Sequence, residues 1–141
     1  MKKLSRRQER ELALKYLYSL EIQQKLFTDL RPRQFESMSE LPEGFTGETK
    51  EAYHLDLVLD ISHNLDFIDD VIKEHLVDWR LERLSVVDKN ILRIAIYEII
   101  FNPEVPKAVA INEAVEIAKK YGSEDSPGFI NGILAQIEEI E

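Results

Sequence analysis

The first ten residues, MKKLSRRQER, gather five basic side chains and a single acid in a chain whose net charge is -9. The basic residues are Lys2, Lys3, Arg6, Arg7 and Arg10. Ser5 and Gln8 have the spacing of a capping box, which predicts a helix beginning after Ser5. Cations are disfavoured there because the helix dipole is positive at its N-terminus, and such a broken local rule points to function. We interpret this segment as a phosphate contact to nucleic acid, with a frayed, solubilising terminus as the alternative.

Two tyrosines follow this basic segment on the same expected helix. Tyr16 and Tyr18 project about 200° apart, so both cannot face the core. Tyr18 lies off the apolar stripe, and an exposed ring beside cations can stack on an unpaired base. The alternative, equally open, is a tyrosine packed at the edge of the core.

Other chemistries find less support in the residue pattern. The three histidines, His54, His63 and His75, lie nine and twelve residues apart, which matches no helical i, i+4 metal pair. Asp56 and Asp60 share a helix face, and paired carboxylates can serve as acid and base where burial separates their pKa values. Such a run of acids is far more often a solvated face, so a small enzyme is the weakest hypothesis. With no Cys for thiol or zinc chemistry, we expect no catalytic residue, no metal and no cofactor.

The charge of the chain is unevenly distributed. Residues 1–33 hold nine Lys or Arg against four Asp or Glu, and residues 34–141 hold nine against twenty-three. This division suggests two kinds of partner, one anionic and one cationic.

A length of 141 residues suits one domain. No apolar run approaches the roughly 20 residues of a membrane span, so we expect a cytoplasmic protein that does not bind membranes.

Apolar residues recur at helical spacing throughout, which predicts an all-α fold of six or seven helices. The expected elements are a helix from Ser5 to about residue 24, a short helix between Pro32 and Pro42, one long helix over about 50–77, a turn near 79–84, a helix capped by Ser85, a helix ended by Gly122, and a last helix capped by Ser126. The helix after Ser85 is apolar almost all round, so it should be central.

Two segments of the second half, LSVVDKNILRIAIYEI and VPKAVAINEAVEIAKKYGSEDSPGFINGIL, resemble the NusB family of bacterial transcription antitermination factors. The match runs from Leu84 to Leu134 without a gap, and RRQERELALKYLY resembles the arginine-rich start of that family. Residues 28–50 match only in length and character. The resemblance implies one all-α domain over residues 1–141, with about seven helices in two small packed sub-bundles, about 1–78 and 79–141. It implies a non-enzymatic protein that binds boxA RNA of ribosomal RNA transcripts together with NusE and joins the RNA polymerase complex with other Nus factors.

The resemblance also implies roles for particular residues. Those implied to meet RNA are Lys2, Lys3, Arg6, Arg7, Arg10, Tyr18, Asp125 and Phe129. Tyr18 and Asp88 are implied to lie on the surface that meets NusE. The alternatives are that Asp125 caps the last helix and that Phe129 belongs to the core. Gly132 is expected to allow close helix contact.

The sequence departs from the family pattern at two places, and two alternatives to the main hypothesis stay open. Gly128 stands where many relatives carry a basic residue, and the sequence ends in EEIE where a basic tail is common, so RNA affinity should depend more on the N-terminal cations and on the partner. An accessory subunit that targets a ribosomal RNA methyltransferase to RNA is the alternative function. A homodimer that hides the basic surface until RNA arrives is also left open.

Overall fold

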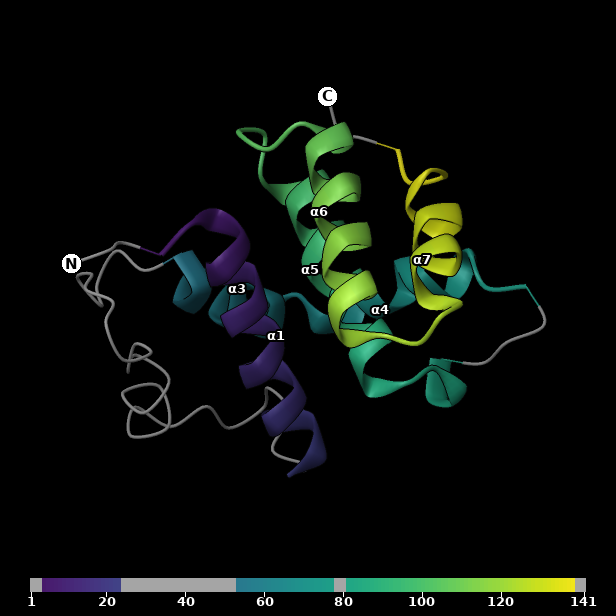
Figure 1. Cartoon of the computed structure of the whole chain (residues 1–141), viewed down its shortest axis with the longest axis horizontal. Coiled ribbons are helices and arrows are strands. Elements are labelled where there is room, and N and C mark those ends of the chain that lie inside the picture. Colours follow the sequence, from purple (N-terminus) through teal and green to yellow (C-terminus); the bar gives the residue numbers. More distant parts are fainter. Residues whose placement is uncertain (1–3, 24–52, 78–80, 139–141) are drawn as a thin grey trace. The chain divides into compact units, whose positions relative to one another are not determined.

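The computed structural model describes residues 4–23, 53–77 and 81–138, and this part of the chain is all-helical. The chain divides into two compact units, Met1–His63 and Asn64–Glu141, which are described separately below (Figure 1). This division comes earlier than the boundary near residue 78 that was expected. The short helix expected between Pro32 and Pro42, together with Lys2 and Lys3, lies outside the described residues. No helix of the described ranges is long and apolar enough to cross a membrane.

The first unit pairs α1 (Arg6–Ile22) with α3 (Tyr53–His63), which pack against each other (Figure 1). The capping box that starts α1 is confirmed, because the Ser5 hydroxyl accepts from the Gln8 N–H and the Gln8 side chain accepts from the Ser5 N–H. The shared core consists of Ala13, Leu14, Leu17 and Leu20 from α1 and Leu55, Leu57, Val58 and Ile61 from α3. Burial of these side chains holds the two helices together.

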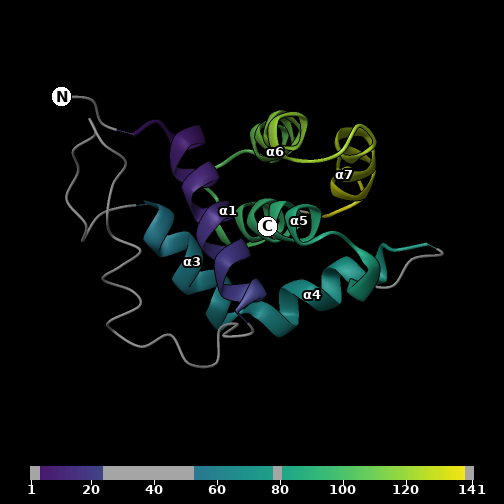
Figure 2. The same ribbon diagram turned by 60° about the horizontal axis from the view of Figure 1, so that its bottom comes forward.

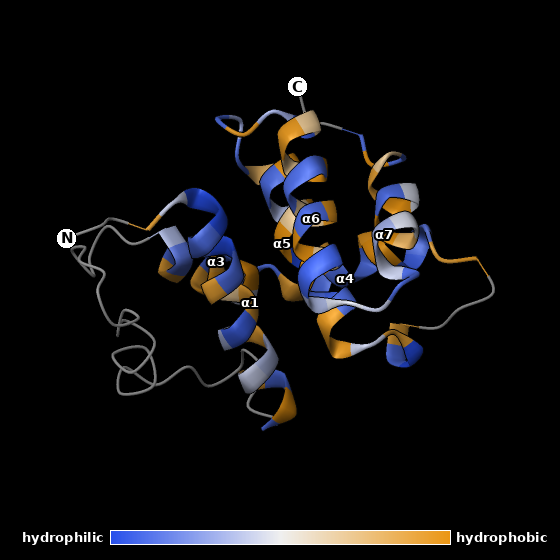
Figure 3. Cartoon of the chain, viewed as in Figure 1, coloured by the Kyte–Doolittle hydropathy of each residue, from blue (hydrophilic) through white to orange (hydrophobic). Residues whose placement is uncertain are grey.

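The second unit contains the remaining elements. They are α4 (Leu65–Glu74), the 3₁₀ turn η2 (Leu81–Arg83), α5 (Val86–Phe101), α6 (Lys107–Tyr121) and α7 (Ser126–Leu134). Figure 2 shows α5 between α4 on one side and α6 with α7 on the other, and α5 packs against all three. Figure 3 shows apolar residues on parts of α5 that are visible behind α6. The prediction that this helix is central is therefore confirmed.

Burial along α5 explains why its sequence is apolar all round. Its fully buried side chains include Leu92 and Ile96, and all residues from 90 to 96, nearly two helical turns, are buried. Ser85 caps the helix as predicted, because its hydroxyl accepts a hydrogen bond from the Asp88 N–H at 3.0 Å. Polar side chains are also buried here, notably Asn90 and Arg93.

The prediction of one long helix over about 50–77 is wrong. The chain forms α3 and α4 instead, and Asn64 between them leaves helical geometry with φ -119° and ψ 20°. Asn is a weak helix former, and the Ser62 hydroxyl donates to the Val58 carbonyl, a bond that bends helices. The apolar stripe continues through the break, so the hydrophobic pattern did not reveal it.

The start of α7 also differs from the expectation. Ser126 is the first helical residue, and Asp125 holds the capping position without a side-chain capping bond. Ser126 is buried, and its hydroxyl accepts from the Ser123 N–H at 2.9 Å. Gly122 does end α6, but with an extended backbone, and a Cβ there would lie 2.6 Å from the Ser126 Oγ. The close helix contact expected at Gly132 is not present, because a Cβ on this residue would meet nothing within 4 Å.

Candidate nucleic-acid interface

The start of α1 presents two arginines side by side. Arg6 and Arg7 are the first two helical residues, and both are exposed. The capping box uses the Gln8 N–H, and the first turn of a helix carries several other N–H groups without partners in the helix itself. Two guanidinium groups and a helix N-terminus together favour an anion such as phosphate.

Glu9 connects Arg6 to the second helix of this unit. One Glu9 oxygen, Oε2, accepts a hydrogen bond from Arg6 Nη1 at 2.8 Å. The other, Oε1, accepts from the backbone N–H of Tyr53 at 3.0 Å, which satisfies an N–H in the first turn of α3. The Glu9 side chain is only 12% exposed, whereas that of Arg6 is 62% exposed. Glu9 is therefore anchored, while the Arg6 guanidinium extends toward solvent.

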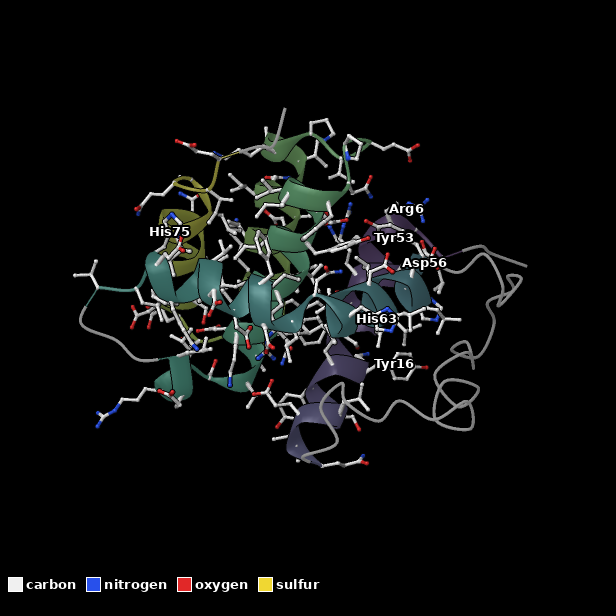
Figure 4. The ribbon with its side chains drawn as sticks, turned by 180° about the vertical axis from the view of Figure 1, so that it is seen from behind. Arg6, Tyr16, Tyr53, Asp56, His63 and His75 are labelled. Atoms are coloured by element: carbon white, nitrogen blue, oxygen red, sulfur yellow. The ribbon has the colours of Figure 1, made fainter. Side chains whose placement is uncertain are left out.

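The ring of Tyr53 supports the Arg6 side chain. The Arg6 Cζ lies 4.2 Å from the centre of the Tyr53 ring, within the range of a cation–π contact. Figure 4 shows Arg6, Tyr53 and Asp56 close together on this unit. The sequence reasoning did not identify Tyr53, since 44 residues separate it from Glu9 and no local pattern connects the two.

Arg10 occupies a different environment from its neighbours in the basic segment. It is 4% exposed, and its Cζ lies 6.0 Å from the centre of the Tyr53 ring. Such burial is not what a direct RNA contact requires. The i, i+4 spacing of Arg6 and Arg10 places both on the helix face that meets Tyr53, which turns Arg10 inward.

The two tyrosines of α1 separate as their spacing predicts. Tyr18 is 43% exposed, which confirms that it lies off the apolar stripe. Tyr16 is half-buried, and its ring centre lies 6.0 Å from that of the buried His54. Tyr18 is thus the tyrosine of this pair whose ring is accessible to a base.

A group of carboxylates lies beside the arginines. The pKa of Asp56 is raised above its usual value, first by partial burial and then by the negative charges of Asp60 and Glu9, although Arg6 opposes the shift. Like charges disfavour ionisation in just this way. The Asp56–Asp60 pair therefore adds negative potential next to Arg6.

The other candidate residues belong to the second unit. Asp125 is exposed at the start of α7 and makes no side-chain capping bond, so the capping alternative for it is not supported. Phe129 is half-buried, so it is neither a fully buried core residue nor a fully exposed ring. Asp88, in the first turn of α5, is half-buried, and its Oδ1 has no hydrogen-bond partner among the described residues. Arg6, Arg7 and Tyr18 thus share α1, whereas these three residues belong to α5 and α7.

The histidines do not form a common site. His54 is buried in α3, His63 is exposed at its end, and the His75 Nδ1 lies 2.8 Å from the Val71 carbonyl (Figure 4). Among the described residues, no three His, Asp or Glu side chains are grouped so that they could hold a metal ion.

The helical units and the cationic start of α1 define an all-α protein with a candidate anion-binding surface. The family model for the NusB family matches residues 7–139. The chain therefore belongs to the NusB family. It is 41% identical to the transcription antitermination protein NusB of Geotalea uraniireducens (strain Rf4) over 135 residues, which cover 94% of this chain and 93% of the relative.

Further relatives agree with this assignment. The transcription antitermination protein NusB of Bacillus licheniformis is 36% identical over 135 residues, covering 96% of this chain and 97% of its own. The solved structure of T. maritima NusB is 41% identical and superposes with a TM-score of 0.81, covering 96% of this chain and 91% of the other. The all-α fold and the family expected from the sequence are thus confirmed.

Proposed function

We propose that this protein is a cytoplasmic, non-enzymatic transcription antitermination factor that binds boxA-type single-stranded RNA of ribosomal RNA transcripts. Family membership and the names of its relatives support the antitermination role. The observation that carries the RNA-binding part is the exposed pair Arg6 and Arg7 at the N-terminus of α1. Lys2 and Lys3, just before this pair in the sequence, add to its positive charge.

The remaining candidate residues take roles that fit their exposure. Tyr18 is an accessible ring for stacking, and the exposed Asp125 carboxylate can accept a hydrogen bond from a base amino group. Phe129 offers the exposed part of its ring to a base. Arg10 supports the surface from beneath instead of contacting RNA.

We further propose NusE as the protein partner, with Tyr18 and Asp88 on the contact surface, in a complex of RNA polymerase and other Nus factors. The described part of the second unit is rich in exposed acids, among them Asp66, Asp70 and Glu104. Complementary charge speeds association with a basic partner more than it raises affinity. Asp88→Asn should therefore slow association with NusE without weakening the binding of RNA alone, which stopped-flow mixing with NusE and a titration with RNA would measure.

The RNA contact is tested by fluorescence anisotropy with a labelled boxA RNA over a salt series, with and without NusE. Each phosphate neutralised on a single strand contributes about 0.7 to the slope of log affinity against log salt. Replacing both Arg6 and Arg7 with Ala should lower the affinity and reduce this slope by at least about 0.7, the contribution of one phosphate contact. The matched control, Lys73→Ala with Arg83→Ala, removes the same charge from exposed positions of the second unit and should leave the slope unchanged. Equal slopes for the parent and the Arg6/Arg7 variant would refute the N-terminal RNA site.

A further inference from the structure

We infer that Tyr53 and Arg6 form a stacking site for one RNA base, in which the Tyr53 ring supports one face of the Arg6 guanidinium and the base covers the other. This inference rests on the proposed RNA binding and adds to it a residue of α3. The ligand is an unpaired nucleobase of single-stranded RNA. Unpaired bases are commonly held by stacking on aromatic rings or on arginine planes, and here one unit supplies both.

The first observation is the geometry of Arg6. Its Cζ lies 4.2 Å from the centre of the Tyr53 ring, so the ring backs the guanidinium plane. The side chain is nevertheless 62% exposed, which leaves a large part of it accessible to solvent. An arginine plane supported on one side by a tyrosine is held in position before the base arrives, so less side-chain entropy is lost on binding.

The second observation is the bridge made by Glu9. Its two carboxylate oxygens hold Arg6 Nη1 and the Tyr53 backbone N–H at 2.8 and 3.0 Å. The bridge fixes the two members of the stack relative to each other, although they come from different helices. The N–H groups of arginine point outward in the plane of the guanidinium, so this bond to Glu9 does not itself cover either face of the group.

The third observation is the local charge. Glu9 pairs with Arg6, and Asp56 and Asp60 lie near enough to each other that like-charge repulsion contributes to the raised pKa of Asp56. These carboxylates lower the positive potential that a phosphate would experience at Arg6. A neutral base is not repelled by them, and its affinity for the guanidinium face depends on stacking. Arg7 is also exposed and next in sequence, and it supplies a second guanidinium that can contact a phosphate.

The test compares Tyr53→Leu with Tyr53→Phe, because both remove the hydroxyl group and only Leu removes the ring. Binding of a boxA RNA to the full-length chain should weaken at least about fivefold for Tyr53→Leu, the lower end of what one stacked base contributes. Tyr53→Phe should bind like the parent. Neither change should alter the salt slope, since no phosphate contact is lost.

An abasic scan separates stacking from a general structural effect. RNAs that lack one base at successive positions are titrated against the parent and Tyr53→Leu. At one position the two proteins should bind equally, because the base that would stack is already missing. The inference is overturned if Tyr53→Leu binds the intact RNA as the parent does, or if its deficit persists with every abasic RNA.

Arg6→Lys provides an independent variant in case Tyr53→Leu fails to fold, as judged by far-UV circular dichroism. Lysine keeps the charge but has no plane to stack on, so it should show the same position-dependent loss. Binding equal to that of the parent would overturn the inference. The proposed function fails separately, when the parent does not bind RNA or when the Arg6/Arg7 double variant leaves the salt slope unchanged.

Discussion

The ion pair between Asp69 of α4 and Arg93 of α5 gives the sharpest stability prediction. Arg93 Nε and Nη2 donate to the two Asp69 oxygens at 2.8 and 2.9 Å, and Nη1 donates to Asn90 Oδ1 at 3.0 Å. The side chain of Arg93 is 3% exposed and that of Asp69 is 14% exposed. Asp69→Asn would remove the carboxylate that pairs with this buried guanidinium. Breaking a buried pair in this way costs about 3–5 kcal/mol, a large part of the roughly 5–15 kcal/mol that stabilises a typical protein.

The assay is urea unfolding of the full chain at pH 7, followed by far-UV circular dichroism. With a slope of about 1–3 kcal/mol per molar urea, a loss of 3 kcal/mol lowers the midpoint by at least about 1 M. Asp70→Asn is the matched control, because the same substitution is made one residue later. Asp70 is 70% exposed and lies 3.9 Å from the Lys73 Nζ, so its loss should cost no more than about 1 kcal/mol.

A second variant tests the same reasoning from the opposite direction. Replacing both partners, as Asp69→Leu with Arg93→Met, removes the charges together and should recover most of the stability lost in Asp69→Asn. The reasoning is refuted if Asp69→Asn and Asp70→Asn shift the urea midpoint equally. It is also refuted if the double variant is less stable than Asp69→Asn alone.

Three further predictions concern a cap, a carboxylate and a glycine, all measured by urea unfolding. Ser85→Ala should cost about 1 kcal/mol, because it removes the hydroxyl that caps α5, and Ser85→Asp should retain most of it. Asp56→Asn should stabilise the protein at pH 7 by up to about 0.5 kcal/mol and have no such effect at pH 3. The sign follows from its raised pKa: the folded carboxyl holds its proton more tightly than the unfolded one, so stability falls as the pH rises through the folded pKa. Gly122→Ala should cost about 1–3 kcal/mol because its Cβ would lie 2.6 Å from Ser126 Oγ, whereas Gly128→Ala, with nothing within 4 Å, should be neutral or stabilising.

Each of these has a contradicting result. An unchanged midpoint for Ser85→Ala would mean that the cap does not contribute to stability. A stabilisation by Asp56→Asn that is as large at pH 3 as at pH 7 would show that the carboxyl charge is not its cause. Equal effects of the two glycine substitutions would exclude close packing as the reason for Gly122.

Local features of the sequence predicted most of the helices. The first residues of α1 and α5 follow from Ser5 and Ser85, whose hydroxyls accept hydrogen bonds from N–H groups three residues ahead. The apolar pattern of α5 predicted its central position, since a helix with no polar face must be covered on several sides. Where a local signal was weak the prediction failed, as at Asn64, because one weak helix former does not interrupt an apolar stripe.

The candidate interface was only partly visible in the sequence. Clustered charge and spacing indicated Arg6, Arg7 and the exposed Tyr18, because these properties depend on near neighbours along one helix. The inward turn of Arg10 was not indicated, since it depends on the ring of Tyr53 on another helix.

The sequence by itself therefore determined the family, the all-α class, the caps of α1 and α5 and the basic start of α1, all of which follow from residue types at short spacing. The tertiary structure decided which charges are buried and which side chains meet. No local pattern indicates a partner for Asp69, but it pairs with Arg93, 24 residues away. Glu9 and Tyr53 meet across 44 residues. Contacts of this kind depend on how helices pack, and the periodicity of a single helix carries no information about its partner's register.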